Sequence, residues 1–261
     1  MTNTAVAIVA LVSILAVAVL AWMQSVRLRD ASIADTCWGL GFVLLAWMYV
    51  ALSRAATPRA WLAAVLVTVW GMRLSVHISR RSRGHGEDPR YAKMRAAQRQ
   101  AFWWRSLFRV FWLQAIILWF VSLPLLLTAS AARPPSLTVL DGVGILLFAV
   151  GFSLEAVGDA QLQRFRNNPS NRGRVLERGL WRYTRHPNYF GDAVLWWGVY
   201  ALAASTPGGW LTLLSPLLMT FLLVRVSGLT LLEESLKRSK PGYSAYVART
   251  PAFFPWFPGG S

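Results

Sequence analysis

Seven runs of apolar residues, separated by polar and often basic connections, dominate this chain. A transmembrane helix needs about 20 predominantly apolar residues, so most of the runs are long enough to cross a bilayer and the sixth is marginal. The pattern predicts an all-α integral membrane protein, a seven-transmembrane helical bundle built as one membrane-embedded domain over residues 1–261. The runs lie at 4–23, 36–53, 60–79, 107–128, 139–160, 190–205 and 210–232.

Lysine and arginine residues gather in alternate connections. Those after the first, third and fifth runs and the C-terminal tail hold two, eight, seven and four, whereas the other connections hold two, one and none. Because cytoplasmic loops carry the excess of Lys and Arg, we expect the N-terminus outside and the C-terminus in the cytoplasm of a bacterial-type inner (plasma) membrane. Residues 4–23 exceed the ~7–15 apolar residues of a signal-peptide core and follow no basic segment, so we expect them to remain as the first span.

The composition agrees with a membrane location and limits the partners. Hydrophobic residues make up 55% of the chain and charged residues 15%, compared with about 25% charged residues in soluble domains. A net charge of +16 would suggest nucleic acid in a soluble protein, but no nucleic-acid-binding motif accompanies it, so we expect no such partner. No obligate protein partner and no metal site are evident, and the single cysteine, Cys37, excludes an internal disulfide.

Ionisable side chains inside the apolar runs need partners or a purpose, because a charge at the centre of a span costs about 3 kcal/mol. On the expected topology all of them lie in the cytoplasmic half of the bundle. They either pair with one another as structural ion pairs or line a polar chamber that opens to the cytoplasm. These residues are Arg73, His77, Arg109, Glu155, Asp159 and Arg225, with Asp35 and Asp192 at the starts of runs.

The spacing of four polar residues near the end of the fifth run favours a ligand site. Glu155, Asp159, Gln163 and Arg166 recur at intervals that place them on one face of a helix. Carboxylates accept hydrogen bonds from hydroxyl groups, and Arg binds phosphate through its planar fork of donors. The stripe therefore predicts a polyanionic cofactor that carries ribose hydroxyls and phosphates.

Short polar motifs on the same predicted side leave structural alternatives open. In "RRSRGHGEDPRY", residues 80–91, the arginines could bind phosphate while Glu87 and Asp88 hold Arg90 or Arg83, or the segment could be an ordinary solvated loop. Asp35 could cap the second helix instead of acting in catalysis. The pair Glu233 and Glu234 could simply be surface charge at a helix end.

One pattern near the C-terminus resembles a known core of membrane enzymes. "RHPNYFG" is followed some forty residues later by "LLEE" and then by "YSAYVART". This pattern resembles the core shared by the isoprenylcysteine and phospholipid methyltransferases, which use S-adenosylmethionine, and by the steroid 5α-reductase superfamily, which uses NADPH. The resemblance implies a cofactor-binding core at about 139–258.

Further segments are similar to the bacterial branch of the steroid 5α-reductase superfamily, a branch of largely unassigned function. They are "DTCWGLGF", "VWGMRLSVHI", "GHGEDPRY", "GDAQLQRFR" and "GLWRYTRHPNYFGD", which together extend the resemblance from about residue 35 to residue 255. The resemblance implies that Glu155, Asp159 and Arg166 face the cofactor, although Glu155 stands where the reductases have Asn. The full set of cofactor residues that it implies is Arg81, Arg83, Glu155, Asp159, Arg166, Arg185, His186, Asn188, Tyr189, Asp192, Arg225 and Glu233.

The catalytic residues of the reductases match less well. Their Gln-Glu-x-Pro motif is absent, so Asp35 is the nearest carboxylate, and Arg73, His77 or Tyr91 would donate to a substrate carbonyl. The resemblance implies an NADPH-dependent oxidoreductase that transfers hydride to the conjugated C=C of a hydrophobic enone, steroid-like or another lipid, taken from the bilayer. The alternatives are an S-adenosylmethionine-dependent lipid or isoprenylcysteine-type methyltransferase and a non-enzymatic membrane transporter or scaffold.

Overall fold

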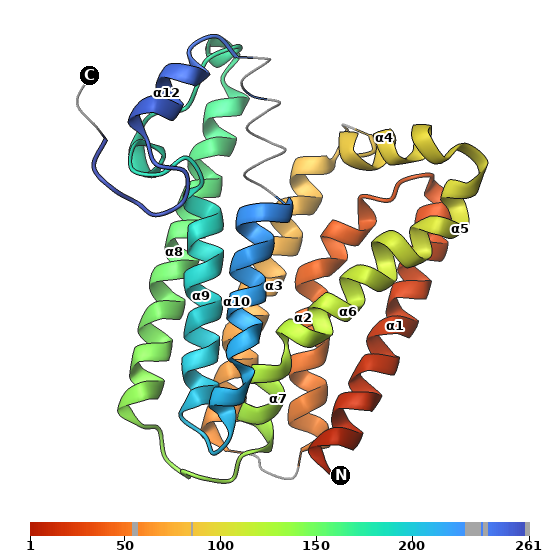
Figure 1. Cartoon of the computed structure of the whole chain (residues 1–261), viewed down its shortest axis with the longest axis vertical. Coiled ribbons are helices and arrows are strands. Elements are labelled where there is room, and N and C mark those ends of the chain that lie inside the picture. Colours follow the sequence, from red (N-terminus) through yellow and green to blue (C-terminus); the bar gives the residue numbers. More distant parts are fainter. Residues whose placement is uncertain (54–56, 85, 228–235, 237–239, 259–261) are drawn as a thin grey trace. The chain divides into compact units, whose positions relative to one another are not determined.

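The computed structural model describes residues 1–53, 57–84, 86–227, 236 and 240–258 (Figure 1). Within these residues the regular elements are helices and there is no strand, which confirms the all-α prediction. Five helices in this part of the chain are long and apolar enough to cross a membrane. They are Asn3–Leu28, Ile33–Leu52, Pro58–Ser82, Pro89–Val121 and Val139–Asn167.

The chain folds into two compact units, each of which is described by itself. The first comprises Met1–Thr138 and Leu202–Ser215, and the second comprises Val139–Ala201 and Pro216–Ser261. The helices of the first unit are α1 (Asn3–Leu28), α2 (Ile33–Leu52), α3 (Pro58–Ser82), α4 (Pro89–Gln98), η1 (Arg99–Ala101), α5 (Phe102–Ser106), η2 (Leu107–Trp112), α6 (Leu113–Val121), α7 (Leu123–Ser130) and η5 (Gly209–Leu213).

The remaining helices lie wholly or mostly in the second unit. They are α8 (Val139–Asn167), η3 (Pro169–Asn171), η4 (Gly179–Arg182), α9 (Pro187–Ala204), α10 (Leu214–Phe221), η6 (Leu222–Ser227) and α12 (Tyr243–Arg249). The expected sixth and seventh spans correspond to α9 and to the shorter apolar segment Gly209–Arg225. Neither belongs to the five candidate spans, so the count of seven stays a prediction.

The connection expected at residues 80–105 contains helix that the hydropathy pattern did not predict. Asp88 accepts a hydrogen bond from the backbone N–H of Arg90, and Pro89 occupies the first helical turn, so α4 starts at an ordinary N-cap followed by proline. The expected fourth span also breaks near its end, because α6 stops at Val121 and α7 starts at Leu123, beside Pro124.

Glycines bring α2 and α3 into backbone contact within the first unit. A Cβ atom built on Gly39 would lie 2.4 Å from the carbonyl oxygen of Gly71, which is closer than real Cβ contacts. Phe42 and Trp70 pack edge to face nearby, with ring centroids 5.6 Å apart. Small residues of this kind let membrane helices approach closely enough for dispersion contacts between their backbones.

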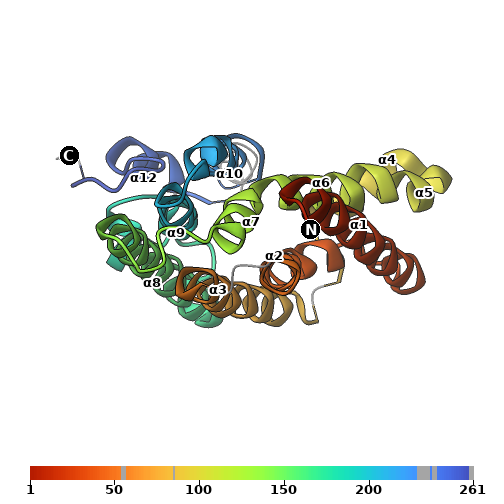
Figure 2. The same ribbon diagram turned by 90° about the horizontal axis from the view of Figure 1, so that it is seen from below.

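A longer seam of glycines joins α8 to α9 in the second unit, where the two helices run side by side (Figures 1 and 2). Gly144, Gly151 and Gly158 recur every seven residues on α8, and Gly191 and Gly198 do the same on α9. A Cβ atom on Gly151 would lie 2.5 Å from the carbonyl oxygen of Gly191, and one on Gly198 would lie 2.6 Å from that of Gly144. The seam therefore fixes the register of the two helices.

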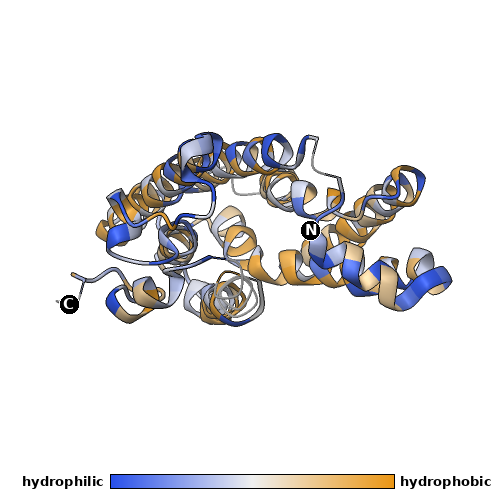
Figure 3. Ribbon diagram, turned by 90° about the horizontal axis from the view of Figure 1, so that it is seen from above, coloured by the Kyte–Doolittle hydropathy of each residue, from blue (hydrophilic) through white to orange (hydrophobic). Residues whose placement is uncertain are grey.

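Apolar side chains cover the outer faces of the long helices, as expected where lipid is the solvent. Figure 3 shows the hydrophobic colour along the spans and more hydrophilic colour in α4. On α8 the exposed apolar positions follow a helical period through Val143, Leu146, Val150 and Val157. This stripe marks the lipid-facing side of α8.

The glycine seam predicts opposite effects for two Gly→Ala substitutions on α8. Gly151→Ala should lower the free energy of unfolding by about 1–3 kcal/mol, because the new methyl group overlaps backbone atoms of α9 that cannot rotate away. Gly142→Ala, which meets no atom within 4 Å, should be neutral or stabilising by up to about 1 kcal/mol through helix propensity. Thermal unfolding in detergent measures both; equal effects would contradict the seam.

Candidate functional site

Two carboxylates lie buried on α8 near the end of its apolar stretch. Glu155 is 3% exposed and Asp159 is 6% exposed. A Cβ atom on Gly191 would lie 2.5 Å from the backbone nitrogen of Glu155, so α9 passes directly against this turn of α8. The glycine seam thus places the first turns of α9 beside both acids.

An asparagine from the first turn of α9 completes this polar cluster. The side-chain amide of Asn188 donates to Asp159 Oδ1 over 2.9 Å. The other polar atom of that amide, Asn188 Oδ1, is buried and receives no hydrogen bond from the residues that the structure describes. A buried acceptor without a donor is costly, so a ligand that supplies an O–H or N–H group would stabilise it.

The two residues before α9 are also buried, but one of them has a structural task. Arg185 donates through Nη1 to the carbonyl oxygen of Val247, at 3.2 Å, and to that of Thr250. These carbonyls end α12, whose negative dipole a guanidinium stabilises. His186 is buried and stacks on Tyr189, with ring centroids 5.5 Å apart. Contact of Arg185 or His186 with a cofactor stays a prediction.

Two cations lie near each other where α8 ends. Arg166, in the last turn of α8, is exposed. Lys240 is the second of these cations: its Nζ donates to the carbonyl oxygen of Arg174 over 2.7 Å and lies 5.9 Å from the ring centre of Phe165. Arg225, in η6, is also exposed, and its contact with phosphate stays a prediction. Partial burial, and next the charge of Arg166, lower the pKa of Lys240. A bound anion would relieve this repulsion between cations.

Two other expected cofactor residues are Asp192 and Glu233. Asp192 is half-buried in the second turn of α9, on the same helix as Asn188. Glu233 lies outside the described residues. Lys240 is not among the residues that the sequence predicts for the site. Its position just before the Pro-Gly pair that precedes α12 marks it as a residue at a helix boundary.

In the first unit, the structure brings two of the expected catalytic residues together. The hydroxyl of Tyr91 donates to Asp35 Oδ1 over 2.7 Å, and Arg90 Nη2 donates to Asp35 Oδ2 over 2.6 Å. Asp35 does not cap α2, because the N-cap position belongs to Ser32. Gln114 Nε2 donates to the Tyr91 hydroxyl over 3.1 Å, so this phenol is oriented by two partners.

The other expected residues of the first unit lie along α3 and after it. Arg73 and His77 are half-buried one turn apart on that helix. Arg81 is exposed in its last turn, and Arg83 follows as the exposed C-cap residue. Their roles in catalysis or phosphate binding stay predictions.

Glu87 and Asp88, the two acids of the segment 80–91, hold this segment against the turn between α1 and α2. Glu87 accepts from the backbone N–H of Ala31, at 2.8 Å, and from Arg95, while the N–H of Asp88 donates to Ser32 Oγ over 2.7 Å. Burial alone would raise the pKa of Glu87, but the hydrogen bond from Arg95 and the one from Ala31 outweigh it and lower that pKa.

The expected ion pairs of this segment are partly correct. Asp88 does hold Arg90, with Oδ1 3.0 Å from Nε. Glu87 pairs with Arg95 on α4 instead of with Arg83 or Arg90. The sequence alone could not indicate Arg95, because α4 was not expected.

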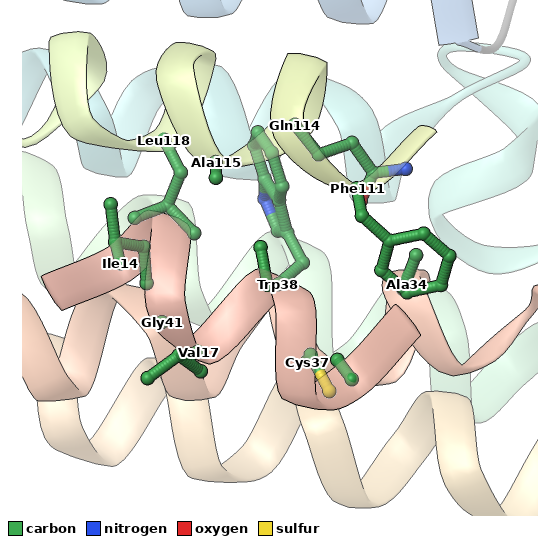
Figure 4. Close-up of a pocket in the computed structure, with 12 residues that line it drawn as sticks. Ile14, Val17, Ala34, Cys37, Trp38, Gly41, Phe111, Gln114, Ala115 and Leu118 are labelled. Carbon is green, nitrogen blue, oxygen red and sulfur yellow. The ribbon is translucent and has the colours of Figure 1, made fainter. Parts of the chain in front are cut away.

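A narrow pocket lies between α1, α2 and the η2–α6 segment (Figure 4). Its walls are mostly apolar, and Trp38, Phe111 and Leu118 are among them. Gln114, which also bonds to Tyr91, contributes an amide to the lining. The cavity of about 50 Å³ is small beside the roughly 300–1,000 Å³ of drug-sized ligand sites, so as it stands it fits the end of a hydrocarbon chain.

Comparison with known proteins places this multi-pass helical protein in a family. A family model described as "Protein of unknown function (DUF1295)" matches residues 21–250, and the chain belongs to that family. The family is associated with steroid 5α-reductase-like proteins. No solved structure matches the chain.

Two curated proteins are similar in sequence. "Uncharacterized protein C594.04c" of Schizosaccharomyces pombe is 27% identical over 264 residues, which cover 90% of this chain and 75% of that protein. "Probable O-methyltransferase ustE" of Ustilaginoidea virens is 38% identical over 61 residues, which cover 23% of this chain and 21% of that protein. The first similarity extends over nearly the whole fold and the second over a short part of it.

The lowered pKa of Glu87 predicts a pH-dependent contribution to stability. A carboxylate whose pKa falls on folding stabilises the protein above its unfolded pKa of about 4.3 and loses this contribution as the pH drops through the folded value. Glu87→Gln should therefore melt below the wild type at pH 7, and the difference should shrink below about pH 4. Thermal unfolding in lipid nanodiscs from pH 7 to pH 3 measures this; a gap independent of pH would contradict the assignment.

Proposed function

We propose that this protein is a membrane-embedded, NADPH-dependent reductase that transfers hydride to the conjugated C=C of a hydrophobic, enone-type lipid. The observation that carries the proposal is the pair of buried acids Glu155 and Asp159 with Asn188 bonded to Asp159. The residues that follow this pair along the chain, 164–185, are rich in arginine. Burial of two acids at one turn is costly in a membrane helix and marks a functional site. The association of the family with steroid 5α-reductase-like proteins supports the same class.

The chemistry of the cluster fits the ribose part of a dinucleotide. Carboxylate oxygens of Glu155 and Asp159 accept from hydroxyls, and the buried Oδ1 of Asn188 lacks a donor that a ribose or carboxamide group would bring. The cations at the end of α8, Arg166 and Lys240, would hold phosphate. Arg81, Arg83, Arg225 and Glu233 complete the proposed binding residues.

Within the first unit, the residues fit the polarisation of a carbonyl group. NADPH supplies the hydride when it is bound. The hydroxyl of Tyr91 lies between Asp35 and Gln114, and the Gln114 amide reaches the apolar pocket. A donor aimed at a developing enolate oxygen lowers the barrier by about 3–4 kcal/mol in comparable oxyanion sites. Tyr91 and Gln114 are the proposed donors, Asp35 positions Tyr91, and Arg73 and His77 are further candidates.

The membrane location supplies the reason for the proposed substrate class. A lipid substrate is dissolved in the bilayer, and the five helices that are long and apolar enough to cross a membrane support a location there. We extend this to seven spans with the N-terminus outside and the C-terminus in the cytoplasm, so that the site faces the compartment that contains nucleotides. A bacterial-type inner membrane is part of this proposal.

A methyltransferase that uses S-adenosylmethionine is the second candidate. Its support is the short similarity to the probable O-methyltransferase and the presence of Glu155 where the reductases have Asn. Two carboxylates suit a cofactor that carries a sulfonium and an ammonium charge, whereas the cations at the end of α8 suit phosphate. The two candidates therefore differ in the charge of the cofactor that they require.

Binding measurements with single variants test the proposal. Asp159→Ala and Arg166→Ala should each weaken NADPH binding at least tenfold in isothermal titration, because each removes a charged partner of the cofactor. Ser153→Ala is the control on the exposed side of α8, where the hydroxyl bonds to Ala149 of its own helix, and should bind normally. Normal binding by both variants would make the stripe structural, and binding of S-adenosylmethionine alone would favour the methyltransferase.

The topology has its own test. A reporter fused to the C-terminus should be active only if it reads the cytoplasm, as a fluorescent protein does, and a periplasmic alkaline phosphatase fusion there should be inactive. Fusions at the end of the second expected span should give the opposite result, because we expect that end outside the cytoplasm: the fluorescent protein should be dark and the phosphatase active. An external C-terminus would overturn the proposed orientation.

A further inference from the structure

The C-terminal segment after α12 exposes three large aromatic side chains, and hydrogen bonds tie its backbone to the loop before α9. Phe254, Trp256 and Phe257 are 72%, 72% and 74% exposed. Exposed apolar side chains of this size on an ordered backbone are a sign of an interaction surface. We call these three residues the aromatic foot.

The backbone of this segment is tied to the residues that precede α9. The N–H of Arg185 donates to the carbonyl oxygen of Pro251 over 2.9 Å, and that of Trp256 donates to the carbonyl oxygen of Tyr183 over 2.9 Å. The hydroxyl of Thr184 donates to the carbonyl oxygen of Phe253 over 2.9 Å. The foot is therefore positioned by the loop that leads to Asn188.

Ring contacts strengthen the same connection. Phe190, in the first turn of α9, packs against Phe253 and Phe254 with ring centroids 5.6 and 6.0 Å away. Tyr183 packs edge to face on Phe257 at 5.9 Å. Movement of the foot would therefore move the start of α9.

The depth of the foot follows from α8, which belongs to the same unit. The exposed apolar stripe of α8 ends at Val157, and its next exposed positions include Gln163 and Arg164, so the hydrocarbon boundary falls between these residues. The loop lies at this level, because Trp181 Nε1 donates to the carbonyl oxygen of Gly158 over 3.1 Å and Gln161 accepts from the N–H of Leu180 over 3.0 Å. Because the foot is tethered to this loop, we expect it at the level of this boundary.

The surroundings of the foot match a phospholipid interface in charge as well as in polarity. Arg178 and Arg182, on the same loop, are exposed. Aromatic side chains prefer the zone between headgroups and acyl chains, and arginines beside them bind headgroup phosphates. These features favour the surrounding bilayer over a second protein as the partner.

We propose that the aromatic foot inserts into the headgroup–acyl boundary of the bilayer and thereby holds residues 183–188 in the conformation that presents Asn188 to Asp159. This anchor does not depend on which cofactor binds. Without the lipid contact, only the hydrogen bonds and ring contacts between the C-terminal segment and the loop would fix the positions of these two segments. The anchor thus couples the bilayer to the polar cluster of the second unit.

Spin-label depth measurements in nanodiscs test the insertion. In a Cys37→Ser background, single cysteines replace Phe257, Ser170 as an exposed loop control, and Val150 as a lipid-facing control on α8. The label at 257 should be buried roughly 5–10 Å below the headgroup level, between the two controls in its exposure to oxygen and to a water-soluble nickel complex. Nickel exposure at 257 equal to that at 170 would overturn the proposal.

Hydrogen exchange tests the coupling to the site. The triple variant Phe254→Ser, Trp256→Ser, Phe257→Ser should raise amide exchange of residues 183–190 at least tenfold in nanodiscs. Exchange in the first half of α8, which belongs to the same unit, should stay unchanged and so show that this unit is folded. If the triple variant no longer inserts and yet residues 183–190 exchange at the wild-type rate, the foot does not hold the loop. Because neither measurement involves NADPH, failure here would leave the proposed function untouched.

Discussion

The close approach of α8 and α9 is the constraint on which the second unit depends. Without a Cβ atom at Gly151 and Gly191 the two backbones touch, and this contact places Asn188 against Asp159. Between membrane helices there is no hydrophobic driving force, so dispersion contacts along such a seam and the polar bonds across it must supply the association. Stability and the candidate site therefore depend on the same few glycines.

In the first unit, ion pairs and hydrogen bonds compensate the charges of the acidic side chains. Asp35 is placed between Arg90 and the hydroxyl of Tyr91, so its charge is shared by two donors at one end of the helices. Glu87 and Arg95 form a second pair nearby that fixes α4 to the turn before α2. Pairing of this kind keeps each buried or half-buried charge compensated, as the low dielectric requires.

Hydropathy and spacing anticipated the parts of this structure that depend on local sequence. The first five apolar runs became long helices, and the acids Glu155 and Asp159 lie buried one turn apart as their spacing indicated. Partners far apart in sequence could not be predicted, because no local pattern links Tyr91 to Asp35 or Arg185 to the end of α12.

Two local features of the sequence indicate parts of the structure that hydropathy does not. The seven-residue repeat of glycines at 144, 151 and 158 indicates a helix–helix seam, and Asp88 followed by Pro89 indicates the start of α4. The count of spans is harder to infer, since α9 and the segment after it are less apolar or shorter than the others. The candidate site thus combines predictable acids with a partner, Asn188, whose position only the folded seam determines.

The proposed function requires Glu155, Asp159 and Asn188 to hold the ribose of a cofactor. A density map of the protein in nanodiscs, recorded with saturating NADPH and again with S-adenosylmethionine, tests it most directly. We expect nucleotide density against Asp159 and Asn188 in the NADPH map, with the phosphates toward Arg166. A cluster closed on itself, with the Asn188–Asp159 hydrogen bond intact and no density beside it in either map, would contradict the account.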